Sequence, residues 1–160
     1  MNPTRTELLR AMEETYPTLV RLVSGRDDAA LDYRPAEGDW SAREILAHLV
    51  DDEMYVMRLR VERIVKEDLP HLAPHDEQKW YRGRNTTRDG LSELLADFEL
   101  QRRASLGMIR MLRESDWQRK GYQPEYGEQT AEEWLAIWLR HDQDHLRQIE
   151  ANLEGVGSRE

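Results

Sequence analysis

The sequence predicts an all-α fold, a four-helix bundle, and three observations support this class. Four long segments place apolar residues at steps of three and four, which is the period of an amphipathic helix. Strand signals are nearly absent, apart from a possible small hairpin at "GYQPEYGE". The length of 160 residues suits one domain, residues 1–160, and is enough to bury a core.

The first helix is expected over residues 4–24. Pro17 lies inside this segment and is expected to kink the helix, because proline has no N–H to donate and its ring clashes with the preceding turn. Gly25 follows as a candidate C-cap. The apolar positions that define this helix are Leu8, Met12, Tyr16, Leu19 and Val23.

Capping boxes mark the starts of two further helices. In such a box a serine or threonine and a glutamate three residues later satisfy free N–H groups of the first turn. "SARE" opens a helix over residues 41–66, and "TAEE" opens the last one, over residues 130–153, with Gly155 expected to end it. The third helix is expected over residues 89–114.

The lengths of the connections indicate the topology. About 16 residues join the first two helices and about 15 join the last two, whereas about 22 join the second and third. Bundles use a connection of that length as a crossover, which leaves the two consecutive helices parallel. We therefore expect one long crossover between helices two and three.

The acidic charge balance argues against nucleic-acid binding. The chain has 23 basic and 32 acidic residues, so its formal net charge of −9 repels phosphate backbones. Basic residues gather in "RLRVERIVK", but an acidic residue is interspersed, and we interpret this stretch as a solvated helix face.

The absence of cysteine excludes disulfides, thiolate metal sites and cysteine nucleophiles, and it fits a reducing compartment. No apolar run approaches the ~20 residues that a membrane helix needs, and "MNPTRTELLR" lacks the apolar block of a signal peptide. We expect a cytoplasmic protein without a membrane partner.

Two histidines stand four residues apart in "WLRHDQDHLRQI". His141 and His145 therefore point the same way from one helix, on the face that also carries Trp134 and Trp138, which we interpret as core packing. The metalloprotease pattern H-E-x-x-H does not apply, because Asp142 stands where that pattern has its glutamate.

A third histidine, His48, lies near the apolar face of the second helix. Bundles build metal sites from inward-facing side chains of neighbouring helices, and three imidazoles leave open positions for water or substrate. The sequence therefore predicts a divalent metal held by His48, His141 and His145. The alternative is that these are hydrogen-bonded core histidines. His71 and His75 lie beside prolines, and we interpret them as loop histidines.

A metal enzyme of this kind also needs a base or a residue that orients the ligands. Asp52 follows His48 by four residues on the same side of the helix and is the first candidate, and Asp144 is the second. Glu53 and Arg58 fit a structural ion pair at least as well as a catalytic role. Gln148, one turn beyond His145, is a conceivable partner for a ligand or a water. The alternative interpretation of the acidic run 51–53 is a solvated turn without a catalytic role.

With these residues identified, the chain resembles the DinB-like superfamily, which includes metal-dependent hydrolases of the YfiT type. The matching stretches are "DWSAREILAHLVDDEMYVMRLRVERI", "LPHLAPHDEQKW" and "GEQTAEEWLAIWLRHDQDHLRQI". The resemblance implies an up-down-down-up bundle, a homodimer, and zinc, nickel or manganese at the positions of the three histidines. Relatives in this superfamily include thiol S-transferases that use bacillithiol and a maleylpyruvate isomerase that uses mycothiol, so the resemblance also implies a low-molecular-weight thiol as a candidate cosubstrate.

Two functional hypotheses follow. In the first, the protein is a metal-dependent enzyme, a hydrolase or a thiol S-transferase, that activates water or a low-molecular-weight thiol against a small-molecule substrate. In the second, it is a non-catalytic metal-binding protein or a stress-related interaction or dimerisation protein. A coordinatively closed site would favour the second hypothesis, and a cleft beside the metal would favour the first.

Overall fold

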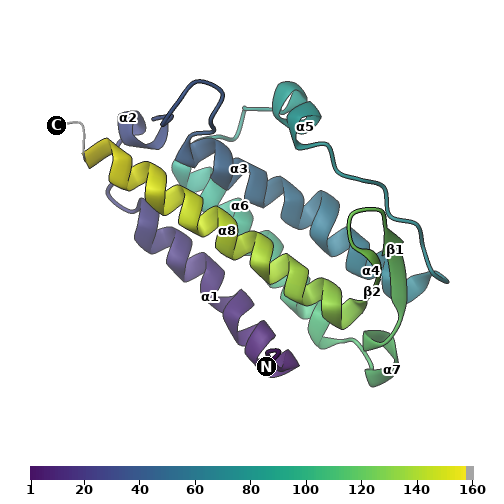
Figure 1. Ribbon diagram of the computed structural model, residues 1–160. Helices are drawn as coiled ribbons and strands as arrows, with labels where there is room; N and C mark the ends of the chain where they lie inside the picture. The colour runs from purple at the N-terminus through teal and green to yellow at the C-terminus, as the bar shows by residue number, and fades with distance from the viewer. Residues whose placement is uncertain (158–160) are drawn as a thin grey trace.

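Four long helical segments form the bundle, in a computed structural model that describes residues 1–157 (Figure 1). They are α1 (Arg5–Val23), the continuous run of α3 (Ala42–Asp52), η1 (Glu53–Met57) and α4 (Arg58–Lys66), then α6 (Leu91–Arg110) and α8 (Ala131–Gly157). The shorter elements are α2 (Asp28–Leu31), α5 (Glu77–Gly83), α7 (Glu114–Trp117), β1 (Lys120–Gln123) and β2 (Gly127–Thr130). The predicted helical fold and the small antiparallel hairpin are both confirmed.

The two clusters of the hydrophobic core give the directions of the helices. One cluster joins the late residues of α1 and α8 to the early residues of α3 and α6, including Leu19, Ile45, Leu94 and Ile149. The other joins the opposite ends, including Met12, Ile64, Ile109 and Trp134. Consequently α1 and α8 run parallel to each other and antiparallel to α3–α4 and α6 (Figure 1). This is the predicted up-down-down-up topology, with its crossover between α4 and α6.

Local capping starts the helices where the sequence predicts. The Ser41 hydroxyl accepts from the Glu44 N–H, and the Glu44 carboxylate accepts in return from the Ser41 N–H at 3.0 Å. Pro17 lies inside α1, which continues through it to Val23. The prediction that Gly155 ends the last helix is wrong, because α8 continues to Gly157. A Cβ at this glycine would lie 3.3 Å from the Tyr33 ring, so its small size serves packing.

The second long helix contains a π-helical turn that the periodicity does not predict. This turn, η1, begins directly after Asp52 and ends where α4 starts. Each π turn inserts an extra residue and so shifts the register of the faces that follow it, and such turns gather at functional sites. The alternative interpretation of the acidic run 51–53 as a solvated turn does not hold at two of its positions, since Asp52 and Glu53 are each 2% exposed.

The crossover between α4 and α6 is held against the bundle at both ends. At its start, the Leu72 N–H donates to the Tyr122 carbonyl at 2.7 Å, which joins the crossover to β1. Further along, the Trp80 indole of α5 donates to Asp51 at 2.7 Å, and the Tyr81 ring stacks on Trp40. Helix α5 is therefore fixed against α3, with contacts from Trp40, just before its start, to Asp51 near its end. None of the helices in the described part of the chain is long and apolar enough to cross a membrane.

Candidate metal centre

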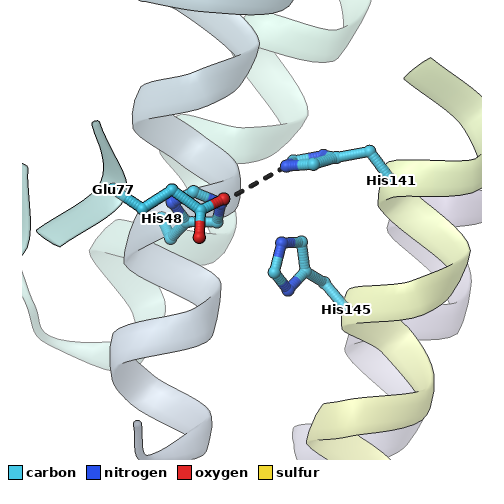
Figure 2. Close-up of side chains that lie close together, drawn as sticks. All are labelled: His48, Glu77, His141 and His145. Atoms are coloured by element: carbon cyan, nitrogen blue, oxygen red, sulfur yellow. Dashed lines mark hydrogen bonds and ion pairs between the residues drawn. The ribbon is translucent and has the colours of Figure 1, made fainter. Parts of the chain in front are cut away.

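Four metal-ligating side chains converge from three segments that are far apart in the sequence. His48 comes from α3, Glu77 from the first turn of α5, and His141 and His145 from successive turns of α8 (Figure 2). One ligand atom from each lies within 4.8 Å of all the others. The structure thus brings together the three histidines that the sequence singled out.

The imidazole rings face one another closely. Nε2 of His48 lies 3.3 Å from Nε2 of His141, and the ring centroids of His48 and His145 are 4.7 Å apart. The Nδ1 atom of His145 lies 3.0 Å from the Gln148 amide oxygen, which leaves its Nε2 atom for the centre. Gln148 therefore holds the His145 ring by the nitrogen that faces away from the centre, as partners of metal-binding histidines do.

Asp52 lies next to the cluster, as predicted. Its Oδ2 atom is 3.1 Å from Nε2 of His48 and 3.2 Å from Nε2 of His141. Its Oδ1 atom lies 3.2 Å from Nε2 of His75, which belongs to the crossover. The interpretation of His75 as a loop histidine is correct for its secondary structure, but the loop carries this side chain into the site.

Glu77 is the functional candidate that the sequence reasoning missed. Asp76 caps α5 by accepting from the Lys79 N–H at 3.0 Å, which fixes Glu77 in the first turn of the helix. Its carboxylate lies 3.5 Å from Nε2 of His48 and is about half exposed. The only sequence signal for it was the concentration of histidine and acidic residues in "HDE" of the crossover.

The electrostatics of the cluster suit a cation. Burial lowers the pKa of His48 to about 3 and also lowers the pKa of His145, so both imidazoles are neutral at pH 7, which is the form that binds metal. Burial alone would raise the pKa of Asp52, but His141 and His75 outweigh it and hold the pKa below its usual range. Nδ1 of His48 is buried without a hydrogen-bond partner among the described residues. This donor set, neutral nitrogens and carboxylate oxygens, fits a divalent metal.

Three other predicted residues lie away from the cluster. Asp144 is exposed and pairs with Arg147 on the outer face of α8, so the structure does not bring it to the site. Arg58 donates to the side chain and backbone of Gln101. Glu53 forms the structural ion pair that the sequence allowed, with Arg102 and not with Arg58.

That ion pair belongs to a buried network joining all four long helical segments. Arg102 on α6 donates two bonds to Glu53, of 2.7 and 2.9 Å, and one of 2.7 Å to Asp142. It also donates to the Met12 carbonyl of α1 at 2.8 Å. Two further donors reach the carboxylates: Trp138 and Thr15. Because Asp142 follows His141 directly, the network fixes the part of α8 that presents the histidines.

A cleft of about 480 Å³ opens onto the cluster. Asp52, His75, Glu77 and His141 form one of its walls. A larger groove, of about 930 Å³, shares His75 and Asp76 with this cleft and is lined by none of the four clustered ligands. The smaller cleft is therefore the route by which a small molecule would reach the histidines.

Known proteins resemble this chain in sequence and share its fold. YfiT of Bacillus subtilis, named "Putative metal-dependent hydrolase", is 27% identical over 143 residues, which cover 88% of this chain and 79% of YfiT. A Bacillus licheniformis protein with the same designation is 28% identical over 145 residues, covering 88% of this chain and 81% of the relative. The solved structure of YfiT superposes with a TM-score of 0.85 at 22% identity, covering 98% of this chain and 91% of that one.

A second solved structure, the DinB-like protein YjoA of Bacillus subtilis, matches with a TM-score of 0.63 at 14% identity, covering 94% of this chain and 92% of that one. The sequence profile of the DinB superfamily matches residues 11–149, which include the histidines of the cluster and the crossover between them. The chain belongs to the DinB superfamily.

Proposed function

We propose that this protein is a metal-dependent enzyme that uses the histidine cluster to activate water or a thiol against a small-molecule substrate. The observation that supports this most strongly is the convergence of four ligand atoms within 4.8 Å beside an open cleft. Relatives named as metal-dependent hydrolases support the same chemistry.

His48, His141 and His145 would hold the cation, and zinc, nickel and manganese all suit imidazole nitrogen with added oxygen ligands. When bound, a divalent cation supplies a Lewis acid that lowers the pKa of a coordinated water or thiol towards neutrality. Oδ2 of Asp52 lies beside Nε2 of His48 and Nε2 of His141, the nitrogens that face the cluster, so Asp52 would act next to the cation as a base or a further oxygen ligand. Gln148 would orient His145 through Nδ1, the ring nitrogen that faces away from the cluster.

The nucleophile is either water, which makes the protein a hydrolase, or a low-molecular-weight thiol such as bacillithiol or mycothiol, which makes it a thiol S-transferase. The lack of cysteine means that the chain itself supplies no thiol, so a transferase would take one from solution. The cleft of about 480 Å³ is large enough for a small molecule and open enough to admit one.

One observation favours a second candidate function, non-catalytic metal binding. Structural metal sites are closed by four protein ligands, and Glu77 is placed to complete such a set. The Glu77→Gln variant separates the two. If the protein is an enzyme, Glu77 has to leave the metal when the reactant binds. The variant, loaded with cobalt in place of the native metal, should then bind a thiol at least as tightly as cobalt-loaded wild type. In a structural site, the variant should lose most of its metal.

The first test is elemental analysis of protein purified without a histidine tag. We expect close to one equivalent of a divalent metal in wild type and its loss in His48→Ala, His141→Ala and His145→Ala. The control is His71→Ala, because His71 is exposed and lies outside the cluster. Equal metal content in all five proteins would overturn the proposed site.

The second test is activity. A panel of esters, amides and alkylating electrophiles is assayed with and without bacillithiol, mycothiol or cysteine, with the three histidine variants as blanks. Turnover without thiol that disappears in the blanks identifies a hydrolase, and turnover only with thiol identifies a transferase. Metal binding without turnover of any compound would support the non-catalytic candidate.

A further inference from the structure

The cleft beside the histidine cluster contains one arginine that no carboxylate neutralises. Arg60, on α4, is the only lysine or arginine among the described residues that line this cleft. It is 8% exposed, and its guanidinium lies over the Trp134 ring at 5.0 Å from the centroid. Its one hydrogen bond to the described residues goes from Nη2 to the Ala73 carbonyl at 2.8 Å.

Arg102 shows what a buried guanidinium requires when its role is structural. That side chain is 3% exposed, and it donates to two carboxylates and a carbonyl and so uses its donors within the protein. Arg60 carries the same positive charge, but its hydrogen bond goes to a single uncharged acceptor, the Ala73 carbonyl. Burying a cation without a counter-charge is costly, and burial accordingly lowers the pKa of Arg60. An anion that enters the cleft would remove this cost.

The acidic side chains of the cleft do not fill that role. Asp52 faces His48, His141 and His75, and Glu77 faces the same cluster. Asp52 and, more weakly, Glu125 on the exposed turn between β1 and β2 act on Arg60 through their electric fields, and neither forms an ion pair with it in the described part of the chain. The guanidinium therefore remains available to a ligand.

We propose that Arg60 is the anchor for the carboxylate of a small organic acid, whose reactive end then reaches the histidine cluster in the same cleft. A planar guanidinium binds a planar carboxylate through two parallel bonds. The nearby carboxylates favour a singly charged ligand over a doubly charged phosphate, because like charges repel more strongly as the ligand charge grows. This inference rests on the proposed function, and it specifies the class of substrate.

The test compares ligands that differ only in the carboxylate. Zinc-loaded protein is titrated calorimetrically with 3-mercaptopropionate and with 3-mercapto-1-propanol, which share a thiol and a chain length. We expect the acid to bind about 10-fold more tightly than the alcohol, the gain typical of a charge-assisted hydrogen-bonded pair. The same comparison, made with acid and alcohol pairs of longer carbon chains, then reports the distance between Arg60 and the histidine cluster.

Variants assign this preference to one side chain. In Arg60→Gln the ratio of the two affinities should fall to about one while the zinc content stays unchanged. Arg60→Lys keeps the positive charge and should keep part of the preference for the acid over the alcohol. Glu125→Gln removes a competing negative charge and should increase this preference. The control is Arg63→Gln, one turn along α4, whose native side chain pairs with Glu67 at the surface. Thermal unfolding of each variant checks that it folds.

A second readout does not require metal. The side-chain Nε–H resonance of Arg60 is followed by NMR in zinc-free protein during addition of propionate or propanol. We expect a shift with propionate alone. An unchanged resonance, together with equal affinity ratios in wild type and Arg60→Gln, would overturn the inference. Failure to bind zinc would instead overturn the proposed function, and the NMR titration would still decide the role of Arg60.

Discussion

At the scale of single residues, buried charge is organised in two opposite ways in this protein. Around Arg102 every charge has a partner, so the network holds four helical segments in one arrangement. Around His48 the imidazole nitrogens and the Asp52 carboxylate lie close together, with Nδ1 of His48 lacking a partner in the described residues. The first arrangement suits structure, and the second suits the binding of a cation.

The Arg102 network makes a prediction for stability. Arg102→Met leaves two carboxylates buried without their cation, and breaking a buried pair in this way costs about 3–5 kcal/mol of unfolding free energy. Urea unfolding followed by circular dichroism measures this loss. Arg103→Met is the matched control, because the Arg103 guanidinium is exposed and, within the described residues, forms its ion pair with Glu99 at the surface, so the change should stay below about 0.5 kcal/mol. Similar midpoints for both variants would contradict the structural role.

Glu44 makes a prediction for pH dependence. Burial alone would raise its pKa, but bonds from Arg34 and Ser41 outweigh burial and lower the pKa from 4.5 to about 2. Because the folded state holds the carboxylate in its charged form, this residue stabilises the fold above pH 4.5, and the contribution is lost as the pH falls towards 2.

The measurement is the difference in unfolding free energy between wild type and Glu44→Gln across this pH range. We expect a difference on the order of 1–2 kcal/mol at neutral pH, discounted because Arg34 is half exposed, that shrinks as the pH falls. The control is Glu150→Gln, which makes the same exchange at an exposed position. A difference that is constant with pH would disprove the assigned ion pair.

At the scale of elements, the crossover decides how complete the candidate site is. Helix α5 brings Glu77, and the segment before it brings His75, so two of the site's polar groups depend on how this connection docks on α3. The docking contacts include the Trp80 bond to Asp51, the packing of two aromatic rings of α5 on Trp40, and the bond that Arg34 donates to the Tyr81 hydroxyl.

These contacts predict local opening when one of them is removed. Trp80→Phe keeps an aromatic ring but deletes the N–H that donates to Asp51, a bond to a carboxylate. Hydrogen exchange of residues 76–84 should therefore accelerate about 10-fold, while α1, α6 and α8 stay protected. Trp117→Phe in α7 makes the same exchange of side chains away from the crossover and should leave residues 76–84 unchanged. Equal protection in wild type and Trp80→Phe would show that other contacts hold α5.

At the scale of the whole molecule, a metal bound between α3 and α8 would link two helices that belong to different ends of the sequence. A ligand that binds only the folded state stabilises it by RT ln(1 + [L]/Kd), about 2.7 kcal/mol at 100 times Kd. For a chain of this size, that corresponds to a rise in Tm of roughly 5–10 °C.

Thermal unfolding with zinc and with chelator tests this linkage. Wild type and His71→Ala should lose the added stability when the chelator is present, whereas His48→Ala should unfold at one temperature under both conditions. A metal-dependent rise in Tm that persists in His48→Ala would place the metal elsewhere on the protein.

The sequence by itself determined the helical class, the capped helix starts, the topology and the three histidines. These features depend on local rules: the period of apolar residues, capping boxes, the length of a connection and the four-residue spacing of His141 and His145. The periodicity placed His48 on an inward face, and the structure confirms that it is fully buried.

Only the tertiary structure decided which distant groups meet. Glu77 and His75 come from an aperiodic crossover, and the partner of Glu53 is Arg102, 49 residues away, rather than the nearby Arg58. The spacing of residues also predicted neither the π turn after Asp52 nor the position of the Arg60 guanidinium in the cleft. The physical reason is that side chains pair through packing in three dimensions, whereas helical periodicity specifies only the face on which each residue lies.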